Sequence, residues 1–427
     1  MILALTVGTA IARPRLGSVR VEPHVAALTG ALLMVVVGGL PVATLVETAG
    51  FLARPALTIV SLMVITLVAE RAGLFQLAAQ RVARAADGDG RKLFTYLFVL
   101  GTLCGMLFTN DAAVLIFTPM VYHLLEDVQA PDWSAAQKVP YYFAILYGAN
   151  LVGALVTSNP INVVVGDWFN IGFAEYARWM IAPSLASVLV SYLGLRWFFR
   201  RDIPRQCRRP NPAAPSGRPV FLAVGCAIIG LTLLGFWTEG VTGAPTAYVA
   251  AAGALLLLVA ATAAGERPVA IVRAVGWDVV AFVVGMFLIA QALRLIGLTD
   301  LVGGVILAAA ERGTQVATLV TGFTAGGMSA VMNNHPVAGT MAMAIGGLPL
   351  AEADRKLLAL AALIGGDLGP KMLPIGSLAA MMWFRLLRDR GVYISYRQYI
   401  KLGVPVTLGA ILIALVLLNL QASVVRM

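Results

Sequence analysis

Long apolar stretches separated by short charged loops run along most of the chain. Uninterrupted stretches such as residues 25–41, 246–264 and 402–420 have the length of about 17 to 25 residues that a helix needs to cross a bilayer. A membrane-spanning strand needs only about 9 to 11 residues. The pattern therefore predicts membrane-spanning helices.

Two apolar stretches in the first half carry polar residues at their centres. Residues 93–125 contain Asn110 and Asp111, and they fall short of the roughly 40 residues that two full crossings need. They predict a re-entrant hairpin. Residues 141–168 are interrupted just before Pro160, which removes a backbone donor and disfavours helix in the residue before it. This stretch predicts a broken helix.

The second half of the chain repeats the first about 223 residues later. The matching positions are Met63 and Met286, Gly73 and Gly297, Asn110-Asp111 and Asn333-Asn334, Pro160-Ile161-Asn162 and Pro374-Ile375-Gly376, and Pro183 and Pro405. The second half accordingly predicts its own hairpin over 316–350 and its own broken helix over 356–384. Duplicated halves with polar breaks at matching places are typical of secondary transporters, whose solute site lies between the repeats near the bilayer midplane.

Basic residues indicate that the two repeats have opposite orientations. The loop 71–92 holds five Arg or Lys residues and its counterpart 294–312 holds two, whereas 167–178 holds one and 385–401 holds five. By the positive-inside rule, each loop and its repeat partner lie on opposite faces of the membrane. The predicted fold is therefore an all-α polytopic membrane protein with two inverted-topology repeats. It has about ten transmembrane helices, two re-entrant helical hairpins and two broken helices.

The predicted topology divides the chain into an N-terminal repeat, a linker and a C-terminal repeat. The repeats span residues 1–205 and 220–427, and the basic, proline-rich linker 206–219 is expected on the cytoplasmic side. Residues 1–12 are expected to be a first span, because no basic residue precedes the apolar run as it would in a signal peptide.

Composition agrees with a membrane protein. Hydrophobic residues make up 59% of the 427 residues, charged residues only 12%, and the mean hydropathy is +0.86, values well outside those of soluble domains. The net charge of +10 gathers in loops beside the spans, so it indicates topology and not nucleic-acid binding. The three cysteines give no disulfide framework. The sequence holds no phosphate-binding loop of the G-x-x-x-x-G-K-[ST] type, so energy must come from an ion gradient or from an ATPase on another chain.

Polar residues at the hairpin tips and helix breaks form the candidate solute site. Unwound backbone at membrane depth is tolerated only inside protein or around a watery cavity. Asparagine offers both donors and acceptors, and half-helix N-termini add partial positive charge. The predicted solute-binding residues are Asn110, Asn159, Asn162, Asn333, Asn334, Lys371, Gly376 and Ser377. No cofactor and no resident metal ion are expected.

Three ionisable residues are candidates for proton coupling, namely Asp111, Asp367 and His335. Each also has a structural interpretation. Asp367 and Lys371 are spaced i and i+4, so they could form an internal ion pair on one helical face. Asp111 is either a proton carrier or a hairpin cap. His335 is either a relay or a neutral core histidine.

These residues resemble those of the arsenite/antimonite efflux permeases (the ArsB family) of the ion transporter superfamily, over nearly the whole length. The motifs that carry the resemblance are Phe108-Thr109-Asn110-Asp111-Ala112-Ala113, Ser158-Asn159-Pro160-Ile161-Asn162, Met328-Ser329-Ala330-Val331-Met332-Asn333-Asn334, Gly366-Asp367-Leu368-Gly369-Pro370-Lys371 and Pro374-Ile375-Gly376-Ser377-Leu378. The sequence departs from the family pattern at His335, where an apolar residue is expected, and at Ala149-Asn150, where the family can carry an acid.

The resemblance implies extrusion of arsenite and antimonite across the bacterial inner membrane in exchange for protons, which gives arsenical resistance. It also leaves room for a separate cytosolic ATPase subunit. A sodium- or proton-coupled anion or dicarboxylate carrier of the same superfamily is the alternative transporter. Outside that class, a gated channel would show uncoupled conductance, and an intramembrane hydrolase built on Ser329 with His335 or His123 would need a nucleophile and base within hydrogen-bond reach. We therefore expect that this protein is a transporter and not an enzyme.

Overall fold

The computed structural model describes residues 22–37, 41–128, 133–150, 153–209 and 218–424, with a few positions before residue 21. Regular structure in these ranges is helical, apart from a short antiparallel pairing of β1 (Arg15–Leu16) with β2 (Val19–Arg20). The span expected over residues 1–12 lies almost wholly outside the described residues. The predicted all-α polytopic fold is confirmed.

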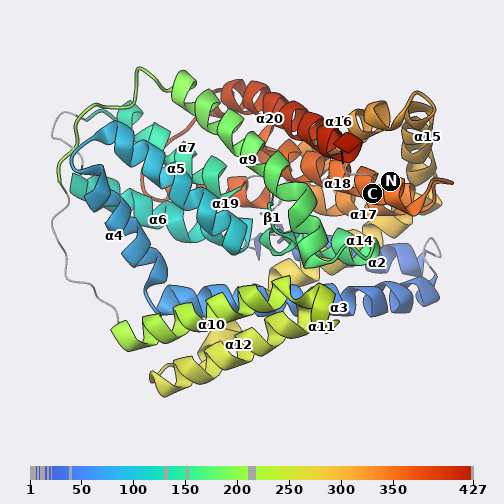
Figure 1. Ribbon diagram of the computed structural model, residues 1–427, viewed down its shortest axis with the longest axis horizontal. Coiled ribbons are helices and arrows are strands. Elements are labelled where there is room, and N and C mark those ends of the chain that lie inside the picture. The colour runs from blue at the N-terminus through green and yellow to red at the C-terminus, as the bar shows by residue number, and fades with distance from the viewer. Residues whose placement is uncertain are drawn as a thin grey trace.

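One group of helices forms a layer along one side of the molecule (Figure 1). Its members are α2 (Pro23–Val36), α3 (Val42–Arg71), α10 (Pro219–Trp237), α11 (Glu239–Thr242), α12 (Thr246–Ala263), α13 (Pro268–Ala274) and α14 (Trp277–Leu295). Within this layer α12 packs on α3, and α2 packs on α14. In the repeat, α3 corresponds to α14 and α2 corresponds to α12. The α12–α3 contact is therefore the counterpart of the α2–α14 contact, and the layer contains matching helices from both halves.

The remaining helices of the first half contain the predicted hairpin and broken helix. They are α4 (Leu74–Ala86), α5 (Gly90–Leu107), α6 (Asn110–Val128), α7 (Ala135–Ala149), η1 (Val156–Ser158), α8 (Pro160–Trp168) and α9 (Phe173–Phe198). Helices α5 and α6 form the hairpin, whose tip is buried at Thr109 and Asn110. The segment α7–η1–α8 is the broken helix.

The second half repeats this order. Its helices are α15 (Leu298–Ala310), α16 (Thr314–Met332), α17 (Asn334–Gly346), α18 (Glu352–Leu368), η2 (Gly369–Lys371), η3 (Pro374–Gly376), α19 (Leu378–Arg388) and α20 (Tyr396–Val424). Helices α9 and α20, the last of each half, lie side by side (Figure 1). Helices α4 and α15, another counterpart pair, lie at opposite ends of the molecule, as an inverted pair would.

Six helical segments in the described part of the chain are long and apolar enough to cross a membrane. They are Ala43–Arg71, Phe173–Phe198, Pro219–Trp237, Thr246–Ala263, Pro268–Leu295 and Tyr396–Val424. The first continues through Pro55, whereas the sequence predicts a span that begins at Pro55 and ends at Ala69. The other apolar stretches are two shorter helices, His24–Val36 and Leu298–Ala310, and the hairpin arms and half-helices.

Glycines allow the hairpin and the broken helix of each half to pack backbone against backbone. A Cβ on Gly365 of α18 would lie only 1.9 Å from the carbonyl oxygen of Gly322 in α16, and a Cβ on Gly105 of α5 only 2.1 Å from that of Ala149 in α7. Small residues permit such close helix crossings in membranes. One arm of each hairpin therefore packs closely against the first arm of the broken helix in the same half, α5 against α7 and α16 against α18.

Backbone angles match between the two halves. Gly73 and Gly297 precede α4 and α15 with φ of 85° and 81°, a left-handed conformation that glycine adopts without strain. Extended Asn159 precedes α8 as extended Ser377 precedes α19. The equivalent of Asn159 is thus Ser377, and the sequence-based pairing of Pro160 with Pro374 is displaced by four residues.

Candidate functional site

A cavity of about 620 Å³ lies between the helical layer and the first hairpin. Its walls are the end of α3, the start of α4, the first turns of α6 and the α13–α14 junction. The polar groups in its lining are Thr66, Glu70, Gln76, Thr109 and Asp111. The described lining contains no lysine or arginine, so the cavity carries carboxylates as its only charged groups.

Two carboxylates line this cavity from opposite walls, and only one of them was predicted. Asp111 belongs to the first turn of α6, and Glu70 lies near the end of α3. Glu70 is not among the predicted site residues, because the sequence places it at the end of a span, where an interfacial position suffices and nothing indicates a cavity. Gln76 and Thr66 were missed for the same reason: they lie in helices with no polar motif.

Asp367 joins the two halves of the chain. Its Oδ1 accepts from Asn159 Nδ2 at 2.7 Å, and its Oδ2 accepts from Asn162 Nδ2 at 3.0 Å and from the backbone N–H of Gly153 at 3.2 Å. Gly153 and Asn159 belong to the unwound region of the first broken helix, and Asn162 belongs to the first turn of α8. Three predicted residues thus meet in one buried network, and the two asparagines direct their amide nitrogens at a carboxylate.

The ion pair that the i, i+4 spacing of Asp367 and Lys371 allowed is not formed in the structure. Helix α18 ends at Leu368 and the chain tightens into η2, so Lys371 leaves the face that carries Asp367. The Lys371 ammonium is buried and has no hydrogen-bond partner within the described ranges.

Asn110 holds the first hairpin tip against the first broken helix. When its amide nitrogen faces the three carbonyl oxygens around it, it donates to Gly105 at 2.9 Å, Ala149 at 3.1 Å and Ser158 at 3.2 Å. These carbonyls end α5, α7 and η1, where helical partners are lacking. Three helix ends therefore converge on Asn110, whose two amide N–H groups are shared among their carbonyl oxygens.

The second hairpin tip is organised by Asn333 and His335. Asn333 Oδ1 accepts from the His335 backbone N–H at 3.2 Å and lies 3.0 Å from His335 Nδ1, while His335 Nε2 is buried without a partner. Asn333 has φ 74° and ψ 155°, a region almost restricted to glycine. The tip thus stores backbone strain in a residue that also caps α17.

The remaining predicted residues have local roles in the structure. Ser377 Oγ accepts from the backbone N–H of Ala380 and caps α19. Gly376 packs so tightly that an added Cβ would lie 2.8 Å from the carbonyl oxygen of Ala330. Asn334 is half-buried at the start of α17.

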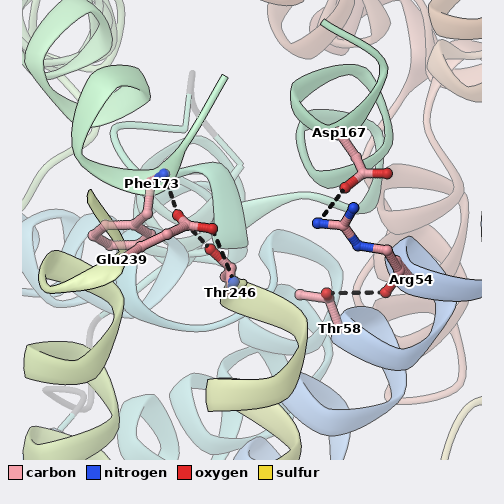
Figure 2. A network of polar contacts seen from close by, with 6 residues as sticks. All are labelled: Arg54, Thr58, Asp167, Phe173, Glu239 and Thr246. Carbon is pink, nitrogen blue, oxygen red and sulfur yellow. Dashed lines mark hydrogen bonds and ion pairs between the residues drawn. The ribbon is translucent and has the colours of Figure 1, made fainter. Parts of the chain in front are cut away.

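A second polar pocket of about 180 Å³ lies on the far side of the first broken helix from the cavity. Figure 2 shows its network, in which Arg54 of α3 pairs with Asp167 of α8 at 3.4 Å. Nearby, Glu239 accepts from the backbone N–H groups of Phe173 at 2.8 Å and Thr246 at 3.0 Å. These are the first residues of α9 and α12, so Glu239 caps two helices.

Comparison with known proteins agrees with this arrangement. The family model described as arsenical pump membrane protein matches residues 1–421. The chain belongs to this family. An arsenical pump membrane protein of Escherichia coli is 33% identical over 403 residues, covering 93% of each chain, and a putative arsenical pump membrane protein of Bacillus subtilis is 24% identical over 87% of this chain and 88% of that one.

The fold of this arsenical pump family member also has a solved relative. The YdaH transporter of Alcanivorax borkumensis, described as having an unusual topology, aligns with a TM-score of 0.59 over 99% of this chain and 96% of that one. At 16% sequence identity, the likeness concerns the fold alone.

Proposed function

We propose that the protein extrudes arsenite and antimonite across the bacterial cytoplasmic membrane in exchange for protons. Family membership supports an arsenical solute. The observation that carries the proposal is the charge of the 620 Å³ cavity, whose lining holds Glu70 and Asp111 and, among the described residues, no basic group. Such a cavity disfavours dicarboxylates and other anions and suits a small neutral triol such as arsenous acid.

Among the three proton-coupling candidates, Asp111 is the best placed. Asp367 is occupied by three donors, and His335 is buried against Asn333. The Asp111 side chain lines a cavity large enough for water and solute. A proton on Asp111 would neutralise a charge in the solute path, which gives a direct way for protonation and solute occupancy to affect each other.

Binding of the solute would use the polar layer behind the cavity. Pro160, at the start of α8, lines the cavity and connects it to Asn159 and Asn162. Asn162 Oδ1 lacks a partner in the described structure, and so does the Lys371 ammonium. An acceptor and a cation at this depth suit a hydroxylated solute that both donates and accepts hydrogen bonds.

The test is arsenite uptake into everted membrane vesicles under an imposed proton gradient. Asp111→Asn is expected to retain downhill arsenite movement but to lose gradient-driven accumulation by at least about tenfold, because the neutral amide cannot carry a proton. Asp127→Asn is the matched control, because Asp127 is exposed on the same helix. Gradient-driven accumulation by Asp111→Asn at the parental level would contradict the proposal. Inhibition of arsenite uptake by added succinate but not by added antimonite would also contradict it. A cytosolic ATPase subunit would be detected separately, as ATP-dependent uptake without a gradient.

A further inference from the structure

The mouth of the 620 Å³ cavity carries an exposed carboxylate. Among the described residues that line the cavity, Glu70, Gln76 and Ala274 are exposed and the others are half-buried or buried. These three residues therefore mark the mouth, and Asp111, which is half-buried, lies further inside. Glu70 is the charged residue that a solute meets first.

The residue that follows Glu70 is a cation held away from this mouth. Arg71 is the last residue of α3, and consecutive side chains of a helix point in different directions, about 100° apart. Its Nη1 donates to Oε2 of Glu266 at 3.0 Å, in the loop between α12 and α13. Arg71 consequently does not line the cavity, although its neighbour does.

Glu266 holds a second guanidinium group in the same way. Its Oε1 lies 3.6 Å from Nη1 of Arg218, which precedes α10 and also donates to the carbonyl oxygen of Ala264. Arg218 is likewise absent from the cavity lining. One carboxylate at the end of the helical layer thus directs two cations to the side of the loop and away from the cavity.

The other charged groups near the mouth do not offset Glu70. Arg273 precedes Ala274 but is exposed and does not line the cavity. Asp278 lies close to the lining residue Gly276, with Oδ1 3.5 Å from the position that a Cβ of Gly276 would occupy. The nearest group on this side of the mouth is therefore a further carboxylate.

We infer that Glu266 is a positioning residue that keeps Arg71 out of the mouth, so that Glu70 acts there as a specificity-determining residue against oxyanions such as phosphate and arsenate. Phosphate and arsenate are charged at neutral pH, so a negative mouth repels them. Arsenous acid is a neutral triol and passes. The inference rests on the proposed function, because only a neutral solute benefits from this charge.

The charge of the mouth can be measured with a cysteine inside the cavity. Leu115→Cys, on the α6 wall, is made in a background without the three native cysteines. The purified protein is labelled with a cationic and with an anionic methanethiosulfonate, and the ratio of the two rates is divided by that of a free thiol. Glu70→Gln is expected to lower this ratio at least about threefold at low ionic strength, and added salt is expected to reduce the difference. Glu47→Gln, exposed at the other end of the same helix, is the control and is expected to leave the ratio unchanged.

The role of Glu266 is tested by freeing Arg71 and then removing it. Glu266→Gln is expected to lower the labelling ratio at least about twofold, because an exposed ion pair is weak and Arg71 then reaches the mouth. Adding Arg71→Gln to this variant is expected to restore the parental ratio or exceed it, which loss of a purely structural contact would not do. An unchanged ratio in either glutamine variant, a loss that Arg71→Gln does not restore, or an unreactive Leu115→Cys overturns the inference.

Specificity is measured as inhibition of arsenite uptake by inorganic phosphate in everted vesicles. Phosphate is expected to inhibit Glu70→Gln at least about threefold more strongly than the parent, and equal inhibition would overturn the specificity role. Labelling needs no arsenite, so the expected labelling without arsenite transport would overturn the proposed function and leave the charge of the mouth standing. Arsenite transport without the expected labelling would overturn this inference and leave the proposed function intact.

Discussion

Asp367 illustrates, at the scale of single residues, what the sequence could and could not predict. Its importance follows from a carboxylate inside an apolar stretch, since intramembrane charges are rare and costly. Its partner did not follow, because Lys371 at i+4 would be the neighbour only if α18 continued. The helix ends first, and the true partners come from a segment about 200 residues away.

For the asparagines, the sequence predicts the positions but not the hydrogen-bond partners. Their position at tips and breaks was predictable, because only such places expose unpaired backbone groups. Their present partners are protein groups: Asn110 binds carbonyls, Asn159 and Asn162 bind Asp367, and Asn333 binds His335. Which amide atoms turn towards a solute depends on tertiary contacts, which residue spacing alone does not contain.

Asn333 gives a prediction at this scale, because its cap hydrogen bond stabilises the folded state while its strained backbone conformation destabilises it. Asn333→Gly removes a backbone strain of about 1–3 kcal/mol and loses a cap bond of about 1 kcal/mol, so the variant is expected to be at least as stable as the parent. Asn333→Ala loses the cap and keeps the strain, so it is expected to be about 1 kcal/mol less stable. Thermal unfolding of the purified protein in detergent measures the order. An alanine variant as stable as the glycine variant would show that the tip conformation is unstrained.

Hairpins and broken helices, at the scale of elements, were largely predictable. Predicted limits of 93–125 and 316–350 agree with α5–α6 and α16–α17 within a few residues, because apolar length and a central polar break define both ends. The second broken helix was harder, since two short 3₁₀ turns, η2 and η3, separate its halves. Helix α3 was also longer than predicted, because Pro55 stays inside it.

Glycine packing between α16 and α18 gives the prediction at this scale. Gly365→Ala would place a methyl group 1.9 Å from the Gly322 carbonyl oxygen, so the two helices must separate, at an expected cost of about 1–3 kcal/mol. Gly327→Ala, on α16 with open space around it, is the control and is expected to be neutral or stabilising, because alanine favours helix. Thermal unfolding in detergent compares the two. Equal midpoints would mean that α16 and α18 do not need this close crossing.

The whole molecule combines a symmetric sequence plan with an asymmetric structure. The repeat and its inversion could be read from motif spacing and loop charge, because both are properties of sequence positions. The location of the open cavity could not, since both repeats carry the elements that could line one. Only the packing shows that Leu67 of α3 and Ile116 of α6 line an open cavity, whereas α14 and α17 meet closely at Ala290 and Gly339.

That asymmetry makes a disulfide across the closed contact informative about the whole transport cycle. Cysteines replacing Ala290 and Gly339 would have Cβ atoms near the 2.7 Å separation seen here, and relaxation of about 1 Å brings them to disulfide geometry. Oxidation would hold α14 against α17 and prevent the two helices from separating. Transport by the oxidised double variant is expected to fall at least about tenfold and to return on reduction, because solute could still enter the first cavity but could not leave on the other side. The reduced protein and the two single variants are the controls, and they must transport under the same oxidant. Full transport by a completely cross-linked protein would mean that the α14–α17 contact stays closed throughout the cycle.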